Sequence, residues 1–268
     1  MTLEEILSSD GIRTLLQPVV QVDDGTVYGY EALSRGPAGS PLERAEALWR
    51  AAEAEGRVGE LDYACRRAAL RAKQRWFPES GTLFVNVDPL VVRSPSFRLG
   101  VTQQWLHEMG IDPGQVVLEI TERRMIDDYE AFRQALRIYR DQGYRVAVDD
   151  VGAGYSSLRT VAEIEPHFLK IDLSLVRGLD RDRARRAVVR ALVGLAHALG
   201  ALAVAEGVER VEELSAVQEL GVDLAQGFLL ARPAEEPPEL SPIALPRLRR
   251  SRVRGRGRER RHGAATGR

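Results

Sequence analysis

The feature that most constrains the fold is a series of short apolar runs that each end on a polar side chain. Seven such runs follow one another along the chain, and segments with helical periodicity separate most of them. This alternation is typical of a closed parallel barrel, in which the carboxyl ends of all the strands meet at one face. We therefore expect an α/β fold, a (β/α)8 barrel of the TIM type, whose polar strand ends converge on one pocket. These residues are Glu31, Asn86, Glu119, Asp149 with Asp150, Lys170 with Asp172, Glu206 and Gln226.

The stretch from residue 146 to residue 158 carries the most informative of these strand ends. It combines a short β-branched strand, the adjacent carboxylates Asp149 and Asp150, a glycine-punctuated turn and two serines that can cap a helix. Two carboxylates at short range make each other's ionisation costly, so a divalent cation would stabilise the pair. The alternative is an acidic turn without a ligand, because Asp and Gly are ordinary turn residues. The other polar strand ends favour the metal site.

The order of the elements can be read from the same pattern. Residues 15–22 and 27–31 are expected to form strands joined by the tight turn Asp23-Asp24-Gly25, and strands joined so closely are antiparallel. The barrel should therefore open with a hairpin. The other expected strands are 82–87, 115–121, 144–150, 168–172, 201–206 and 222–228. The expected helices are 41–55, 59–76, 97–109, 127–141, 155–163, 182–199 and 210–219, with Val188, Leu192, Leu195 and Leu199 on one apolar face of helix 182–199.

Length and composition place the chain among globular proteins. With 268 residues and 44% hydrophobic content it can form one large domain or two small ones, and the unbroken alternation favours a single barrel over residues 1–240. The single cysteine, Cys65, cannot form an internal disulfide, which suits a reducing compartment. The amino terminus lacks the features of a secretory signal, and no apolar run approaches the ~18 residues of a membrane span. We expect a cytoplasmic protein.

Charge is distributed unevenly, although the total is only −1. Residues 241–268 contain ten arginines and one glutamate, a charge of +9, which leaves −10 for residues 1–240. Because this Arg/Gly-rich segment has little apolar surface to bury, we expect a disordered basic tail. The tail either contacts a polyanion or is a neutral extension.

Arginine greatly outnumbers lysine in this chain. There are 36 arginines, whereas the two lysines are Lys73 and Lys170. Lys170 lies within the strand-end motif Leu169-Lys170-Ile171-Asp172. A lysine retained there indicates that the site needs a compact ammonium rather than a planar guanidinium.

Together these motifs resemble the EAL-domain family of cyclic di-GMP phosphodiesterases. The signature Glu31-Ala32-Leu33 is followed, in the order of the family, by motifs at residues 84–87, 118–122, 149–157, 169–172, 205–209 and 226–228. One such motif would be weak evidence, whereas this number in order over residues 10–235 is specific. The resemblance implies a (β/α)8 barrel with an antiparallel first strand pair, in agreement with the predicted hairpin.

The resemblance also implies a site for two divalent cations. Hydrolysis of a phosphodiester requires an activated water, neutralised phosphoryl oxygens and a stabilised leaving group, all of which two cations can supply. By comparison with the family, Glu206 would be the general base and Lys170 would hold the attacking water. Mg²⁺ or Mn²⁺ would support activity, and Ca²⁺ would inhibit it. The implied metal ligands are Glu31, Asn86, Glu119, Asp149 and Asp150, with Asp149 bridging the two cations.

The family comparison places substrate contacts at Gln17 and Arg35, and the Arg35 guanidinium could fork onto a phosphate. Supporting groups around the metals and the base would be Asp172, Glu209 and Gln226. Together these residues predict a binding site for cyclic di-GMP.

The loop after Asp150 couples the metal site to a homodimer in the family, and Glu122 corresponds to the residue that ties this loop down. The sequence departs from the family here, since Val151 and Ala153 stand where Phe and Thr are usual. Leu173 replaces a common Arg. The loop substitutions put the packing of the loop in doubt, and none of the three removes a predicted ligand.

The leading interpretation is metal-dependent hydrolysis of cyclic di-GMP to linear pGpG, which lowers the level of this second messenger. The alternative is a catalytically silent cyclic di-GMP receptor or interaction domain. Silent members of the family typically lose a ligand or the base, whereas this chain retains them. A third interpretation, an unrelated metal-dependent barrel hydrolase, would require the order of the motifs to be coincidental.

Overall fold

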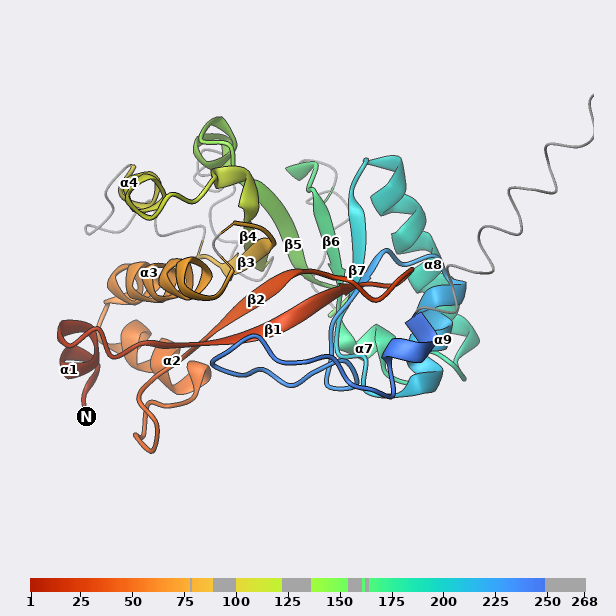
Figure 1. The fold of residues 1–268 in the computed structure, drawn as a ribbon, viewed down its shortest axis with the longest axis horizontal. Helices are drawn as coiled ribbons and strands as arrows, with labels where there is room; N and C mark the ends of the chain where they lie inside the picture. Colours follow the sequence, from red (N-terminus) through yellow and green to blue (C-terminus); the bar gives the residue numbers. More distant parts are fainter. Residues whose placement is uncertain (78, 89–99, 122–135, 154–160, 162–163, 249–268) are drawn as a thin grey trace, which may run out of the picture.

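The computed structural model describes residues 1–77, 79–88, 100–121, 136–153, 161 and 164–248. Within these residues eight strands close into a barrel in sequence order (Figure 1). Strand β1 runs antiparallel to both β2 and β8, and every other neighbouring pair is parallel. The predicted (β/α)8 barrel with an initial hairpin is therefore confirmed. The strands are β1 (Arg13–Gln21), β2 (Val27–Arg35), β3 (Thr82–Asn86), β4 (Val116–Thr121), β5 (Arg145–Val151), β6 (Phe168–Ile171), β7 (Leu202–Ala205) and β8 (Leu224–Ala225).

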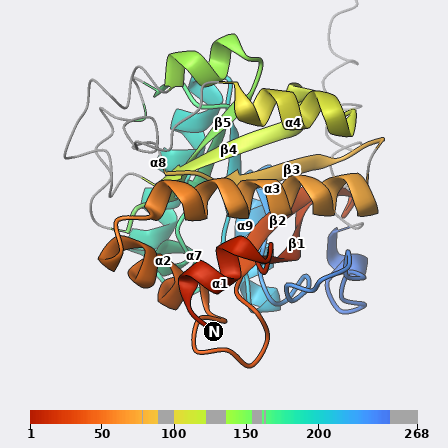
Figure 2. The same ribbon diagram turned by 90° about the vertical axis from the view of Figure 1, so that its left-hand side faces the viewer.

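Helices surround the barrel on the outside. Those at the amino-terminal end of the chain lie together on one side, and α8 and α9 lie on the other (Figures 1 and 2). The short helices α1 and α7 were not predicted from the sequence. The described helices are α1 (Leu3–Ser8), α2 (Ala45–Ala54), α3 (Val58–Trp76), α4 (Val101–Met109), the 3-10 turn η2 (Pro113–Gln115), α7 (Leu173–Val176), α8 (Arg183–Ala198) and α9 (Val211–Glu219).

Strands β2 and β8 differ most in length from the prediction. Strand β2 continues four residues past Glu31, because its hairpin partner β1 extends equally far and Arg13 pairs with Arg35. Strand β8 has only two residues, since the chain turns at Gly227 to pack on Val208. A Cβ atom at Gly227 would lie 2.2 Å from the carbonyl oxygen of Val208, so only glycine fits this contact.

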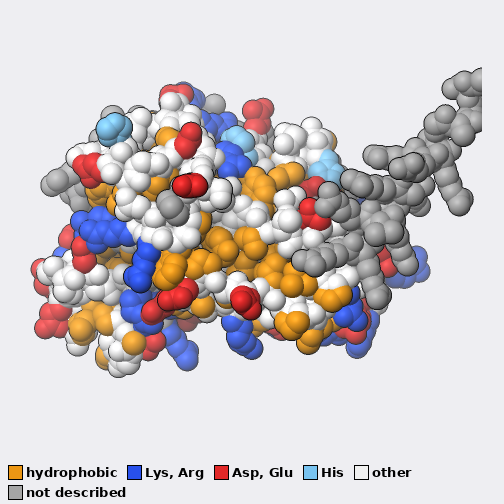
Figure 3. Space-filling model, in the orientation of Figure 1, with side chains coloured by type: hydrophobic (Ala, Val, Ile, Leu, Met, Phe, Trp, Pro, Cys, Tyr) orange, Lys and Arg blue, Asp and Glu red, His pale blue; other side chains and the backbone are white. Residues whose placement is uncertain are grey.

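The predicted apolar face of α8 is partly wrong. Val188 is 45% exposed, whereas Val189, Leu192, Val193 and Ala196 are buried. The helix is rotated relative to the prediction because its register is set by packing on β6 and β7. No helix among the described residues is both long and apolar enough to cross a membrane. In the view of Figure 3, hydrophobic side chains form a band over β1 and β2, with charged side chains of both signs around it.

The domain boundary predicted at residue 240 stays a prediction, but the described chain remains in contact with the barrel beyond it. Residues 241–248 pack on the barrel, and Ala244 and Leu248 are fully buried. Leu248 covers the hairpin turn at Gly25, the Ser241 amide donates to the Leu230 carbonyl, and Gln218 on α9 donates to the Arg247 carbonyl. The apolar side chains of residues 241–248 pack on the barrel surface, which the arginine-rich composition of this segment did not indicate. Residues 249–268 lie outside the described residues, so the predicted disorder of the tail stays a prediction.

Candidate functional site

The interior of the barrel has an apolar layer below a polar one. Seven strands each contribute one side chain to a separate buried cluster, and the residue two positions nearer the mouth is polar. Because side chains alternate across a strand, residues two apart point into the same interior. The apolar layer is Val19, Phe84, Val117, Ala147, Phe168, Val204 and Leu224, and the polar layer above it is Gln17, Asn86, Glu119, Asp149, Lys170, Glu206 and Gln226.

Strand β2 completes the polar layer with Glu31. The position two residues below it is Gly29, where a Cβ atom would lie 2.1 Å from the carbonyl oxygen of Thr82. Any side chain there would push β2 away from β3, so glycine allows the two strands to approach. Glu31 is thereby brought into line with the other strand-end residues at the mouth.

Lys170 lies at the centre of the polar layer and contacts four carboxylates. Its Nζ atom is 2.7 Å from Glu119 Oε1, 2.8 Å from Glu206 Oε1 and 3.1 Å from Asp149 Oδ1. Glu31 Oε2 is more distant, at 3.5 Å. The Lys170 side chain is 1% exposed, so these contacts form where water is excluded and charge interactions are strong. The lysine therefore holds four strand ends together.

Two amide side chains, Asn86 and Gln226, link carboxylates of this layer to one another and to Gln17. Asn86 Nδ2 donates to Glu31 Oε1 and to Glu119 Oε2, at 3.2 Å each. Gln226 Nε2 donates to Gln17 Oε1 at 2.9 Å and to Glu31 Oε2. Each amide bridges two strand ends, so the side-chain orientations at the mouth depend on one another.

Burial and neighbouring charges shift the pKa values at this site strongly. Burial is the largest influence on Glu119 and raises its pKa well above the usual range, aided by the charge of Glu31 and opposed by Lys170. Burial likewise raises the pKa of Glu206, together with the charge of Asp149. Burial alone would lower the pKa of Lys170, but the surrounding carboxylates raise it well above 10.5. The ammonium therefore stays charged while Glu119 and Glu206 resist ionisation.

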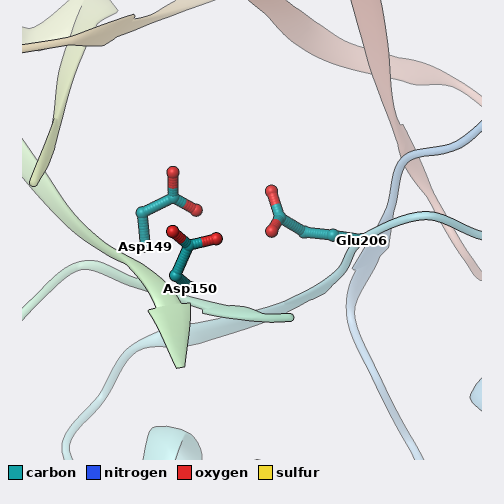
Figure 4. A group of neighbouring side chains, drawn as sticks. All are labelled: Asp149, Asp150 and Glu206. Carbon is teal, nitrogen blue, oxygen red and sulfur yellow. The ribbon is translucent and has the colours of Figure 1, made fainter. Parts of the chain in front are cut away.

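A group of three carboxylates opens towards the mouth beside Lys170. Carboxylate oxygens of Asp149, Asp150 and Glu206 all lie within 4.8 Å of one another. The three side chains come from the end of β5 and the turn after β7, and they point towards one another (Figure 4). Asp150 has a left-handed backbone with φ of 57°, a rare conformation for a residue with a side chain. This conformation accompanies a turn that places two consecutive carboxylates on the same side.

The donor set fits hard divalent cations. With every group ionised, the five carboxylates Glu31, Glu119, Asp149, Asp150 and Glu206 and the single ammonium of Lys170 carry a formal charge of −4. Oxygen ligands of this kind are preferred by Mg²⁺, Mn²⁺ and Ca²⁺. The raised pKa values of Glu119 and Glu206 show that the charge is poorly compensated by the protein alone. Divalent cations would reduce this charge.

Comparison with known proteins identifies the barrel. The family model of the EAL domain matches residues 2–233. The chain belongs to the EAL domain family. Among curated relatives of this EAL domain, the cyclic di-GMP phosphodiesterase RocR of Pseudomonas aeruginosa is 33% identical over 234 residues, which cover 86% of this chain and 59% of RocR. The chain spans 27–33% of the length of four other curated relatives it matches.

Solved structures give the same assignment. Klebsiella pneumoniae BlrP1, in a complex with calcium and cyclic di-GMP, matches with a TM-score of 0.80 and 31% identity over 86% of this chain and 58% of the BlrP1 chain. A standalone EAL protein from Vibrio cholerae O395, in its form bound to cyclic di-GMP, matches with a TM-score of 0.77 and 25% identity over 87% of this chain and 97% of that one. BlrP1 has also been solved with manganese and cyclic di-GMP.

The EAL barrel brings together most of the residues predicted from the sequence, with differences in detail. Gln17 is buried, and its amide already bonds to Gln226 and to the Ala231 carbonyl, so it lies beneath the mouth instead of at its surface. Arg35 is half-buried and lines a pocket of about 300 Å³ together with Asn86. The predicted contact of Arg35 with substrate stays a prediction.

Of the predicted supporting residues, Gln226 lies in the polar layer, whereas Asp172 and Glu209 contact residues outside that layer. Asp172 caps α7 by accepting from the Ser174 amide, and Glu209 lies 3.6 Å from Arg177 on the surface. Glu122 and the loop from residue 154 lie outside the described residues, so the roles predicted for them stay untested. Val151 is buried in the core beside Ile171, and Leu173 is exposed at the start of α7.

Sequence reasoning missed two features near the mouth. Glu213 on α9 is buried and accepts hydrogen bonds from the amides of Gly178, Glu209 and Arg210, so it fixes the turn that follows Glu206. Phe228 is 47% exposed and has the guanidinium of Arg232 over its ring, 4.3 Å from the centroid. Phe228 follows Gln226 and Gly227 directly, and Arg232 lies four residues further on. An aromatic residue after a polar strand end was the available signal.

Proposed function

We propose that this EAL domain hydrolyses one phosphodiester of cyclic di-GMP and releases linear pGpG. The observation that carries the proposal is the convergence at one mouth of a buried lysine, four carboxylates that contact it and an amide that bridges two of them. Relatives of the same family include a cyclic di-GMP phosphodiesterase, and solved members hold cyclic di-GMP with calcium or manganese. Both facts support cyclic di-GMP as the substrate.

Two divalent cations, Mg²⁺ or Mn²⁺, would be held by Glu31, Asn86, Glu119, Asp149 and Asp150. When bound, they would supply a water of lowered pKa and neutralise the phosphoryl oxygens. For Asn86 to offer its carbonyl oxygen, its amide must turn from the orientation in which Nδ2 donates to the two glutamates. The donor set and its formal charge support this assignment.

Glu206 is proposed as the general base, which takes a proton from the attacking water on a carboxylate oxygen. Its side chain is 17% exposed, the most open of the carboxylates around Lys170, so water and substrate can reach it. Burial raises the pKa of Glu206, so its carboxylate is a stronger proton acceptor than an exposed one. Lys170, 2.8 Å from Glu206, would orient that water and stabilise negative charge as it develops on the phosphoryl group.

Two residues are proposed to hold the substrate. Arg35 lines the same pocket as Asn86, and its guanidinium could bind a phosphate in a bidentate manner. The exposed ring of Phe228 offers a face on which a guanine base can stack. Gln17 would act indirectly, by holding Gln226 and through it Glu31.

The test is direct. Purified protein would be incubated with cyclic di-GMP and Mg²⁺, and the products separated by chromatography; pGpG is expected. Glu206→Gln should still bind cyclic di-GMP but lose turnover by at least about 10³-fold, because the amide cannot accept the proton. The exposed Glu212→Gln on α9 serves as the matched control and should retain activity. Binding without any product from the unaltered protein would favour the receptor, and turnover of Glu206→Gln within tenfold would reject Glu206 as the base.

The homodimer and the contact of the tail with a polyanion both concern segments outside the described residues. They stay predictions, as does the cytoplasmic location.

A further inference from the structure

A buried ion pair lies on α3, beneath the end of β3 and outside the acidic site. Asp62 and Arg66 are one helical turn apart, and their side chains are 1% and 3% exposed. Arg66 Nη2 donates to Asp62 Oδ2, and Arg66 Nη1 donates to the Thr102 hydroxyl on α4 at 2.9 Å. An Asp and an Arg at this spacing normally form a solvated surface pair worth a few tenths of a kcal/mol. Here the pair is enclosed by the protein.

The second oxygen of Asp62 reaches the chain close to the site. Asp62 Oδ1 accepts a hydrogen bond from the backbone amide of Asp88 at 3.0 Å. Asp88 lies two residues after Asn86, whose amide bridges Glu31 and Glu119. On the opposite side, the Val87 amide donates to the carbonyl oxygen of Glu119 at 3.0 Å. The turn that carries Asn86 out of β3 is therefore fixed from one side by β4 and from the other by Asp62.

Stability alone does not account for this pair well. Removing two charges from water costs several kcal/mol per ion, and apolar residues of similar size in place of a buried ion pair are often as stable or more so. A charged acceptor does, however, make a stronger and more directional bond to a backbone amide than a neutral one. The pair combines a buried carboxylate that accepts a hydrogen bond from one backbone amide with a guanidinium whose charge opposes the rise in the Asp62 pKa that burial causes.

We propose that Asp62, paired with Arg66, is a positioning residue that sets the end of β3 and thereby aims the Asn86 side chain at Glu31 and Glu119. The proposal rests on the proposed function, in which these three side chains hold a divalent cation. Residues that orient metal ligands typically contribute 10–100-fold to metal affinity. Loss of the Asp62 carboxylate should therefore weaken metal binding even when the protein stays folded.

The experiment uses the full chain without nucleotide. The double variant Asp62→Leu/Arg66→Met removes both charges and so avoids leaving an unpaired buried ion. Mn²⁺ affinity is measured by calorimetric titration, and hydrogen exchange at the Asp88 amide reports whether the turn is held. The control is Leu70→Ala, a destabilising change at a fully buried apolar position on the same helix. We expect the double variant to bind Mn²⁺ about tenfold more weakly with faster exchange at Asp88, and Leu70→Ala to bind as the unaltered protein does.

Wild-type Mn²⁺ affinity in a folded double variant would overturn the proposal, as would an equal loss in Leu70→Ala. If the double variant does not fold, Asp62→Asn decides, because its neutral oxygen is a weaker acceptor and should reduce affinity about threefold; no reduction would overturn the proposal. If the unaltered protein bound no Mn²⁺, this inference and the proposed metal site would both fail. If it bound Mn²⁺ without cleaving cyclic di-GMP, only the proposed activity would fail.

Discussion

Lys170 Nζ lies 2.7 Å from Glu119 Oε1 inside the barrel, and the two side chains are 1% and 0% exposed. Neither charge can be stabilised by water, so each depends on the other and on the carboxylates around them. Burial acts against both charged forms, but the surrounding carboxylates together keep Lys170 protonated, whereas the single lysine cannot keep Glu119 readily ionised. The metal-free site is therefore short of positive charge.

Replacing Lys170 distinguishes its effect on turnover from its effect on the charge of the metal site. In Lys170→Met the site becomes more negative, so Mn²⁺ binding should be retained or strengthened, whereas turnover should fall by about 10²-fold or more because the ammonium near the phosphoryl group is lost. The matched control is Lys73→Met, which removes the other lysine of the chain and should leave turnover within about twofold. Steady-state kinetics and calorimetric titration with Mn²⁺ check this. Unchanged turnover in Lys170→Met would exclude a catalytic role.

Divalent cations should stabilise the fold in a pH-dependent manner. The folded-state pKa values of Glu119 and Glu206 are raised, so the metal-free folded state binds more protons than the unfolded state and loses stability as pH rises above about 4.5. Cations bind the deprotonated carboxylates, so the increase in Tm on adding Mn²⁺ should be larger at pH 8 than at pH 5, by a few degrees.

The same measurements compare metals. Mg²⁺ and Mn²⁺ should support turnover, and Ca²⁺ should raise Tm without supporting it, because its longer and more flexible coordination misplaces water and phosphate. Full activity with Ca²⁺, or a pH-independent Tm increase, would contradict the proposed site.

Lys73 gives a second pH effect, of opposite sign. Its ammonium is buried against the carbonyls of Phe77 and Gly81, and burial lowers its pKa to about 8. Between pH 8 and about 10.4 the unfolded state keeps a proton that the folded state has released, so the contribution of Lys73 to stability increases with pH. The free energy of unfolding of the unaltered protein minus that of Lys73→Met should rise over this range in urea titrations. A difference that stays constant with pH would show that the pKa of Lys73 is not lowered in the folded protein.

Two truncations test where the domain ends. Removing residues 249–268 deletes nine arginines and one glutamate and should change neither Tm nor turnover at high salt. Removing residues 241–268 also takes away the buried Ala244 and Leu248 and should lower the free energy of unfolding by about 2–3 kcal/mol. If the longer tail acts on a polyanion or on the acidic barrel, its effect should disappear as salt shortens the Debye length below ~8 Å. Equal stability of the two truncated forms would support the domain boundary predicted at residue 240.

The polar layer of the candidate site could be predicted because it depends on the spacing of residues within single strands. On β4, Val117 and Glu119 occupy alternate positions of one short strand, and the same spacing recurs at Phe168 and Lys170 on β6. A strand places residues two apart on one face whatever surrounds it, so the polar layer follows from the sequence. The mutual contacts of these side chains follow from barrel closure, which the element order indicates.

What the sequence did not reveal depends on distant contacts. Asp62 and Arg66 have the spacing of a surface pair, and only their enclosure by Asp88 and Thr102 makes them a buried pair. Leu248 lies in a segment rich in arginine and glycine, and its burial requires the turn at Gly25 more than 200 positions earlier. Periodicity within one segment contains no information about which remote surface will cover it.

The two-residue spacing between the apolar and polar layers has a consequence for how members of such a fold can diverge. One residue inserted between Val117 and Glu119 would turn Glu119 towards the surrounding helices and bring its neighbour inward, so packing and chemistry would be lost in the same event. Insertions in the connections outside the barrel do not disturb this spacing. Proteins with this barrel should therefore vary freely in the length of the connections between strands. Within a strand, one residue can replace another, but no residue can be added or removed.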